Sequence, residues 1–160
     1  MKSLLFISLM TCAVIQVHAQ QYRTAFGIKG DYTTLDLPSA ELSVKHFFAG
    51  QSAVELNLGG SSRYIWLQTM YERNQFLTND LEWYWGVGAD GGYWAKGNYG
   101  RSDIESTSGF WVGLDGTIGL EYTFNVVPIN LALDTGPSMR IVPDVKFGWM
   151  AGFAVRYAFR

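Results

Sequence analysis

The chain has 160 residues, enough for one domain, and its formal net charge is −2 at pH 7. That charge, without any basic run, excludes a nucleic-acid-binding class. Charged residues make up only 16% of the chain, against roughly 25% in soluble domains, and aromatic residues make up another 16%. A mean hydropathy of +0.04 excludes a bundle of membrane-spanning helices.

Residues 1–19 have the pattern of a cleaved signal peptide. Lys2 supplies the positive start, residues 4–17 form an apolar run, and Ala19 completes a small-residue cleavage site. The run is shorter than the ~20 residues that an anchoring helix needs, and the sequence before Cys12 is a poor lipoprotein signal. We expect a mature domain of residues 20–160. Because Cys12 is the only cysteine, that domain has no disulfide and no reactive thiolate.

The mature chain contains eight stretches in which apolar and polar side chains alternate. A period of two residues predicts a β-strand with two different faces. The predicted strands are residues 22–30, 39–47, 52–58, 63–73, 81–94, 109–124, 127–135 and 147–159.

The last predicted strand has the clearest alternation. Its odd positions carry apolar or aromatic side chains, most of them large, and its even positions are mostly small, with one charge at Arg156. A soluble sandwich strand points its bulk into a packed core. A strand of a membrane barrel is apolar outside and polar inside, which this pattern matches. The sequence therefore predicts an all-β fold, an eight-stranded antiparallel up-and-down transmembrane β-barrel.

The predicted connections differ between the two ends of this barrel. Those after the second, fourth and sixth strands are mostly short, and we call that end the short-turn rim. Those after the first, fifth and seventh strands are longer and rich in Gly, Pro, Ser and Asp, and we call that end the long-loop rim. The longer connections are residues 31–38, 95–108 and 136–146. Residues 59–62 are a short exception. Such asymmetry is typical of outer-membrane barrels.

The inward parity collects most of the charges. An eight-stranded barrel is just wide enough for side chains to fill, and buried charges must pair. The predicted lumen charge network near the short-turn rim is Arg23, Lys45, Glu55, Glu72, Glu82, Glu121 and Arg156. Within it, Arg156 is expected to pair with Glu72, Glu82 or Glu121. Near the long-loop rim, Lys29 faces Glu41, Asp90, Asp115 and Asp134. We expect Arg101 or Arg140 to pair with these surplus acids. We favour acids that are paired or solvated over acids that bind Ca²⁺.

Two further features concern the size and place of side chains. Glycines opposite Tyr84, Trp94 and Arg156 are expected to leave room for these large side chains in the lumen. Aromatic residues near the strand ends predict girdles at the membrane interfaces. They are Tyr22, Tyr64, Tyr71, Phe76, Trp83, Tyr93, Phe110, Trp111, Tyr122, Phe124, Trp149, Tyr157 and Phe159.

The signal peptide, the eight alternating strands and the aromatic last strand together resemble the small outer-membrane β-barrel proteins of Gram-negative bacteria, of the outer membrane protein A and porin-like type. The resemblance covers residues 20–160. Its most specific element is Val155, Tyr157 and Phe159, which is similar to the signal read by the barrel-assembly machinery. Arg160 follows, where the family usually ends on the aromatic residue. The resemblance implies a monomer in the bacterial outer membrane, with lipid and the assembly machinery as partners.

The expected function is a structural or surface-interaction role with a side-chain-filled lumen, and no catalytic, cofactor or metal residue is predicted. Gly86–Gly91 matches a dinucleotide pattern but lies inside a predicted strand, and the Asp-Thr-Gly at Asp134 occurs once where a protease needs two. No Ser/His motif surrounds His46, the only mature histidine. The alternatives are a soluble secreted lipocalin-like barrel that binds a small apolar ligand, and an outer-membrane lipid-modifying enzyme.

Overall fold

The fold is a closed barrel of eight antiparallel strands, as predicted. The computed structural model describes residues 22–36, 38–61, 64–95 and 108–159. The predicted signal peptide, Arg101 and Arg160 lie outside them. Each strand pairs with the next, and β1 pairs with β8. The strands are β1 (Thr24–Thr33), β2 (Ser39–Ala49), β3 (Ser52–Ser61), β4 (Tyr64–Phe76), β5 (Leu81–Trp94), β6 (Gly109–Thr123), β7 (Ile129–Val142) and β8 (Lys146–Phe159).

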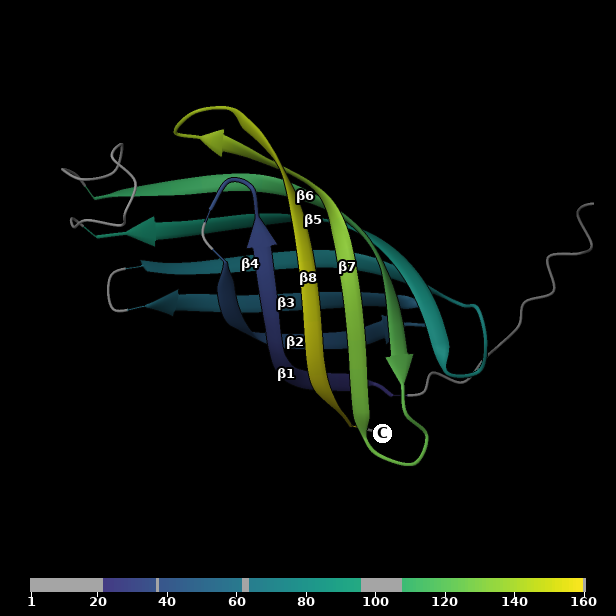
Figure 1. The fold of residues 1–160 in the computed structure, drawn as a ribbon. Helices are drawn as coiled ribbons and strands as arrows, with labels where there is room; N and C mark the ends of the chain where they lie inside the picture. The colour runs from purple at the N-terminus through teal and green to yellow at the C-terminus, as the bar shows by residue number, and fades with distance from the viewer. Residues whose placement is uncertain (1–21, 37, 62–63, 96–107, 160) are drawn as a thin grey trace, which may run out of the picture.

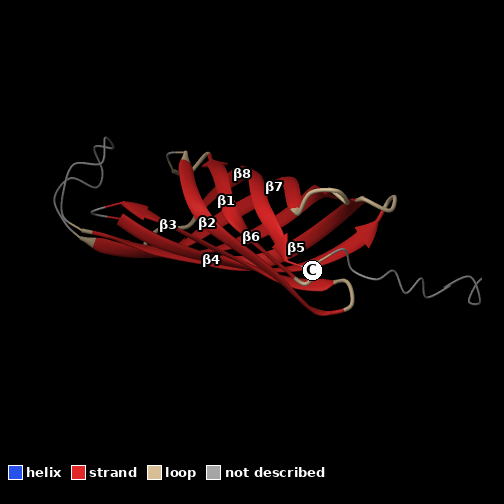
Figure 2. Cartoon of the chain, turned by 90° about the horizontal axis from the view of Figure 1, so that it is seen from below, coloured by secondary structure: helices blue, strands red, loops and turns tan. Residues whose placement is uncertain are grey.

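The strands form one continuous tilted wall. In Figure 1, β7 and β8 cross in front of β2 to β6 at a steep angle, as tilted strands do on opposite walls of a barrel. Figure 2 shows strands and connecting loops in the described chain and no helix. Within the described ranges, no helix is long and apolar enough to cross a membrane.

Side chains alternate between the two faces of this wall along every strand. On β8, Trp149, Phe153 and Tyr157 point outward and are about half exposed, whereas Ala154 and Arg156 are buried inside. The same alternation runs along β6, where Leu114, Ile118 and Leu120 lie outside. The period of two in the sequence therefore corresponds to one apolar outer face and one polar inner face.

Two connections at the long-loop rim are shorter than predicted, because the strands that precede them are longer than predicted. β1 continues to Thr33, and β7 continues to Val142, so only residues 143–145 join β7 to β8. The Gly136–Pro137 pair predicts a turn, but both residues stay paired with β8. Gly136 is required there because a Cβ atom would collide with the carbonyl oxygen of Gly116 on β6. The connection between β5 and β6, residues 95–108, is the long one.

The short-turn rim carries both ends of the described chain. The backbone N–H of Arg23 donates a hydrogen bond to the Phe159 carbonyl at 3.1 Å, which joins the start of β1 to the end of β8. The connections here are residues 50–51, 77–80 and 124–128. Gly50 has a φ of 52°, the left-handed backbone that glycine adopts without strain in a tight turn.

Candidate functional site in the barrel lumen

The interior of the barrel is polar. Among the described residues, buried polar or charged side chains outnumber buried hydrophobic ones, and the largest fully buried side chain is that of Arg156. Several of these residues carry charge, and buried charge is tolerated only where it is paired and hydrogen-bonded. The lumen contacts therefore decide whether this arrangement is stable, and they form one connected network.

One part of the network lies near the short-turn rim around Lys45 on β2. Its ammonium is 2.7 Å from the Glu72 carboxylate of β4 and also pairs with Glu121 of β6. Tyr22, just before β1, donates a hydrogen bond to Glu121 from its hydroxyl. These four side chains are at most 2% exposed. One ammonium therefore pairs with two carboxylates. The hydrogen bond from the Tyr22 hydroxyl adds to the stabilisation of the buried Glu121 carboxylate.

A second part of the network is centred on Arg156 of β8. Its Nη2 atom lies 2.6 Å from Oε2 of Glu55 on β3, across the lumen. Nε donates to the Ser43 hydroxyl at 2.9 Å, and Nη1 donates to the Asn130 side chain at 3.4 Å. Asn130 in turn donates to Glu121 at 2.8 Å. The guanidinium thus joins the first cluster to the middle of the barrel, with each of its nitrogens engaged.

The middle of the lumen is held by Lys29 on β1. Its ammonium lies 3.2 Å from Glu55 and 3.0 Å from Asp134 of β7. The hydroxyl of Tyr84 on β5 donates to the same Asp134 carboxylate at 2.9 Å. Glu55 is therefore shared between a lysine and an arginine, the reverse of the arrangement around Lys45.

Two side-chain amides extend the network to the long-loop rim. Asn57 donates to Glu55 at 2.9 Å and to the Gln68 side-chain oxygen at 3.0 Å. Gln68 then donates to Asp115 at 2.7 Å. A continuous set of hydrogen bonds and ion pairs therefore runs from Tyr22 at one rim to Asp115 near the other.

Glycines make room for the large inward side chains, as predicted. Tyr84, Trp94 and Arg156 pair directly with Gly119, Gly109 and Gly27, respectively. A Cβ atom at Gly119 would meet the Tyr84 ring, and one at Gly27 would meet the backbone of β8. Any larger residue at these positions would displace a lumen side chain or a strand.

The predicted network needs two corrections. Arg23 is exposed, and Tyr22 takes the inward position, because the chain bends at Arg23 before β1 starts at Thr24. The Tyr22 ring packs edge-on against Phe47 with ring centroids 5.2 Å apart. Tyr22 is thus not part of an outer girdle.

The second correction concerns Arg156, which we expected to pair with Glu72, Glu82 or Glu121. It pairs with Glu55, because the strand register sets Arg156 opposite Gly27, Gly27 opposite Ser43, and Ser43 opposite Asn57, which is two residues from Glu55 on β3.

The remaining acids of the predicted set differ in how well they are partnered. Glu82 accepts a hydrogen bond from Asn74 at 2.8 Å near the short-turn rim. Toward the long-loop rim, both carboxylate oxygens of Glu41 and one oxygen each of Asp90 and Asp115 are buried without a hydrogen-bond partner. The acidic surplus predicted at this end is therefore present in the described lumen.

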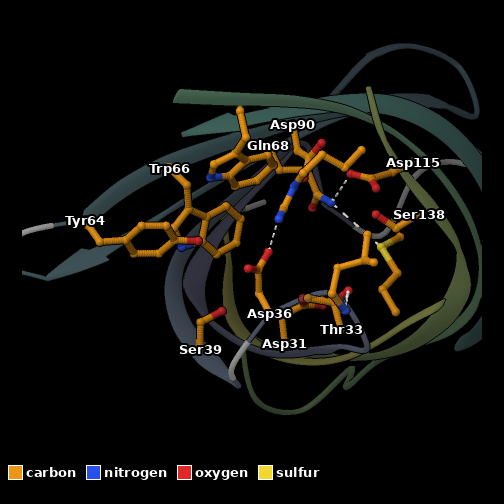
Figure 3. A pocket seen from close by; sticks show the side chains of 14 residues that line it. Asp31, Thr33, Asp36, Ser39, Tyr64, Trp66, Gln68, Asp90, Asp115 and Ser138 are labelled. Carbon is orange, nitrogen blue, oxygen red and sulfur yellow. Dashed lines mark hydrogen bonds and ion pairs between the residues drawn. The ribbon is translucent and has the colours of Figure 1, made fainter. Parts of the chain in front are cut away.

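The mouth pocket is a small cavity of about 40 Å³ at this end of the barrel. Figure 3 shows side chains from the strands and from the β1–β2 connection converging on it. Its lining includes four carboxylates, three aromatic rings and one basic side chain, namely Asp31, Asp36, Asp90, Asp115, Tyr64, Trp66, Trp111 and Arg140. Trp111 is 5% exposed and points inward, so it is not the girdle residue that its place near a strand end predicts. The sequence analysis missed Asp31 because the predicted strand ended at residue 30. β1 continues to Thr33, so Asp31 points inward like Lys29.

Other predicted positions lie outside this network. Val155, Tyr157 and Phe159 point outward on β8, and the rings of Tyr157 and Phe159 are 4.8 Å apart. The Nδ1 atom of His46 lies 2.8 Å from the Thr24 hydroxyl. Gly86–Gly91 lie within β5, not at the start of a helix. No group of three or more His, Cys, Asp or Glu side chains in the described part of the chain is arranged to hold a metal ion.

Comparison with known proteins supports the architecture. No known family model matches the sequence, and no curated protein matches it significantly. The N-terminal β-barrel domain of Pseudomonas aeruginosa OprF is similar in structure, with a TM-score of 0.63, 16% identity, and coverage of 87% of this chain and 100% of that domain. The fold is that of the small eight-stranded outer-membrane barrels. Neisserial surface protein A is also similar, with a TM-score of 0.54, 12% identity, and coverage of 86% of this chain and 96% of its own.

Proposed function

We propose that this chain is a small integral barrel of the bacterial outer membrane with a structural or surface-interaction role, and that it is not an enzyme. Its signal peptide, residues 1–19, directs export. Val155, Tyr157 and Phe159 then present the signal for the barrel-assembly machinery. The mature barrel sits in outer-membrane lipid as a monomer, with the long-loop rim facing the cell exterior.

The observation that carries the proposal is the polarity of the barrel wall. Large apolar side chains cover the outside, including Ile28, Leu67 and Phe153 at 48–61% exposure, while Lys45, Glu55 and Arg156 are fully buried inside. In water, such an outer surface is an aggregation hazard, because monomeric soluble proteins rarely expose large contiguous apolar patches. In a bilayer, the same surface contacts lipid tails, and the closed barrel leaves no unpaired strand edge.

The two alternatives fit this wall and lumen less well. A lipocalin-like barrel needs an apolar interior with space for its ligand, and the charged network from Tyr22 to Asp115 takes that position. A lipid-modifying enzyme needs a nucleophile next to a base. Thr24 beside His46 is the one hydroxyl–imidazole pair among the described residues, and Thr24 lies at the start of β1 on the short-turn rim, away from the exterior.

The proposed lumen is filled by its own side chains and does not conduct as a porin does. Water-filled porin channels need about sixteen strands, whereas eight leave an interior of side-chain width. In planar bilayers, we expect the refolded barrel to show no large, steady conductance. A porin-sized current from the monomer would contradict the filled lumen.

Membrane fractionation of the expressed full-length chain tests the location. We expect the mature protein in the outer-membrane fraction, with an intact mass that corresponds to a chain starting at Gln20. In gel electrophoresis in detergent, the unboiled protein should migrate faster than the boiled protein. The folded barrel stays compact in detergent, and boiling unfolds it. Recovery of the chain in the soluble secreted fraction would support the lipocalin-like alternative instead.

A further inference from the structure

The mouth pocket combines negative charge with aromatic walls. Its four carboxylates face one basic side chain, Arg140, on β7. Lys29 does not balance them, since Glu55 and Asp134 engage its ammonium. The pocket is therefore rich in acidic side chains at the mouth of the lumen.

Two carboxylates of the pocket each have one buried oxygen without a hydrogen-bond partner. Asp115 is only 5% exposed, and its Oδ2 atom accepts from Gln68, but its Oδ1 atom has no hydrogen-bond partner. One oxygen of Asp90, on the neighbouring strand, is likewise buried and unpartnered. An unsatisfied buried acceptor is costly. These two oxygens therefore mark a place where a group that donates hydrogen bonds would be stabilised.

The pocket already receives one cationic side chain. The Arg140 guanidinium pairs with Asp36 and lies 4.7 Å from the centre of the Trp111 ring. This contact shows the two interactions that the walls offer to a cation, a carboxylate and an aromatic face. Asp31, Asp90 and Asp115 remain without a basic partner of their own among the lining residues.

We propose that the mouth pocket binds the primary ammonium group of a small alkyl amine. An ammonium has three N–H donors, which match the unpartnered oxygens of Asp90 and Asp115. A cavity of about 40 Å³ has room for about three water-sized groups, which is enough for an ammonium with its first methylene. Among the described residues, no group of three or more acids is arranged to hold a metal ion, whereas an ammonium needs only these two oxygens. This inference deepens the proposed surface role by naming the class of ligand.

Calorimetric titration of the refolded barrel in detergent micelles tests the proposal with three probes of similar accessibility. Cadaverine carries two primary ammonium groups, 1,5-pentanediol replaces them with hydroxyls, and tetramethylammonium is a cation without N–H donors. We expect saturable binding of cadaverine, at least about tenfold weaker binding of tetramethylammonium, and no detectable binding of the diol. Equal affinity for cadaverine and tetramethylammonium, or no saturable cadaverine binding, would overturn the proposal.

Variants assign the binding to this pocket. Asp115→Asn and Asp90→Asn should each weaken cadaverine binding by about tenfold, because a charge-assisted hydrogen bond becomes neutral. Glu82→Gln removes one lumen carboxylate at the short-turn rim and is the matched control, which should bind as the parent does. Equal weakening by all three variants would mean a general charge effect and would overturn the site.

The mobility shift on boiling confirms that each variant is folded before titration. A barrel that shifts normally but binds no amine contradicts this inference and leaves the proposed membrane role intact. A chain that fails to shift and stays out of the membrane fraction contradicts the proposed function itself.

Discussion

The two ends of the lumen solve the problem of buried charge differently. Near the short-turn rim, Lys45 and Arg156 pair with Glu72, Glu121 and Glu55, so each of these three carboxylates has a cationic partner. Near the long-loop rim, acids outnumber basic side chains, and several carboxylate oxygens have no partner. The first region has the properties of a structural core, and the second has those of a binding surface.

This difference teaches where the barrel can change without losing its fold. A fully paired ion cluster is strongly destabilised when one partner is removed, because the other charge stays buried. An unpaired acid near solvent has little to lose when it is neutralised. Each prediction below either separates the two regions or tests the outer wall that both of them need.

The largest effect is expected from Arg156→Ala. Glu55 would keep only Lys29 as a cationic partner, and Ser43 would lose its contact with the guanidinium. We expect a loss of about 3–5 kcal/mol in the free energy of unfolding, measured by urea titration in lipid vesicles. Arg23→Ala is the control, since Arg23 is exposed, and it should stay within about 0.5 kcal/mol of the parent. Similar losses for both arginines would contradict the placement of Arg156 at the centre of the network.

The next effect concerns the outer wall in the middle of β8. Phe153 lies outside, paired with Gly30 on β1 and Leu133 on β7. Phe153→Arg should cost about 2–4 kcal/mol of folding free energy in vesicles if this position lies at the bilayer midplane. Val126, in the connection between β6 and β7, is 95% exposed, and Val126→Arg should change the same quantity by under about 1 kcal/mol. Equal tolerance at both positions would mean that Phe153 does not contact lipid.

The fold and the faces of its strands were predictable from the sequence, because alternation is a local signal. The alternation along a strand such as β8 identifies which of its residues lie on each face. Eight such strands with no helix between them leave few alternatives to a barrel. The glycines opposite Tyr84 and Arg156 followed from the same parity. Volume and parity are properties of neighbouring positions, so one sequence is enough to show them.

The errors arose where a local signal depends on something distant. A bend at Arg23 shifts the parity by one residue and places Tyr22 inside. Gly136 and Pro137 predict a turn, but pairing with β8 keeps them in a strand. The choice of Glu55 as the partner of Arg156 depends on the tilt and stagger of strands that are not adjacent, which parity alone does not specify.

A smaller effect is expected from Tyr22→Phe near the short-turn rim. The change removes one hydroxyl that donates to the buried Glu121 carboxylate and keeps the ring against Phe47. We expect a loss of about 1–3 kcal/mol in unfolding free energy, the range for a lost hydrogen bond to a charged group. Tyr157→Phe, on the half-exposed outer face of β8, is the matched control and should change stability by less than about 0.5 kcal/mol. Equal effects would place Tyr22 outside the network.

The smallest effect is expected at the long-loop rim, from Asp90→Asn. Asp90 lacks a partner for its Oδ1 atom and faces other acids of the mouth pocket, so neutralising it removes repulsion without breaking an ion pair. Urea titration should show stability within about 0.5 kcal/mol of the parent, or slightly above it.

Glu72→Gln is the comparison at the other end, where the carboxylate lies 2.7 Å from the Lys45 ammonium. Its loss should reach about 1.5–3 kcal/mol, because a charge-assisted contact is weakened in the buried cluster. A larger loss for Asp90→Asn than for Glu72→Gln would reverse the assignment of the two regions and would make the acids of the mouth pocket part of the structural core.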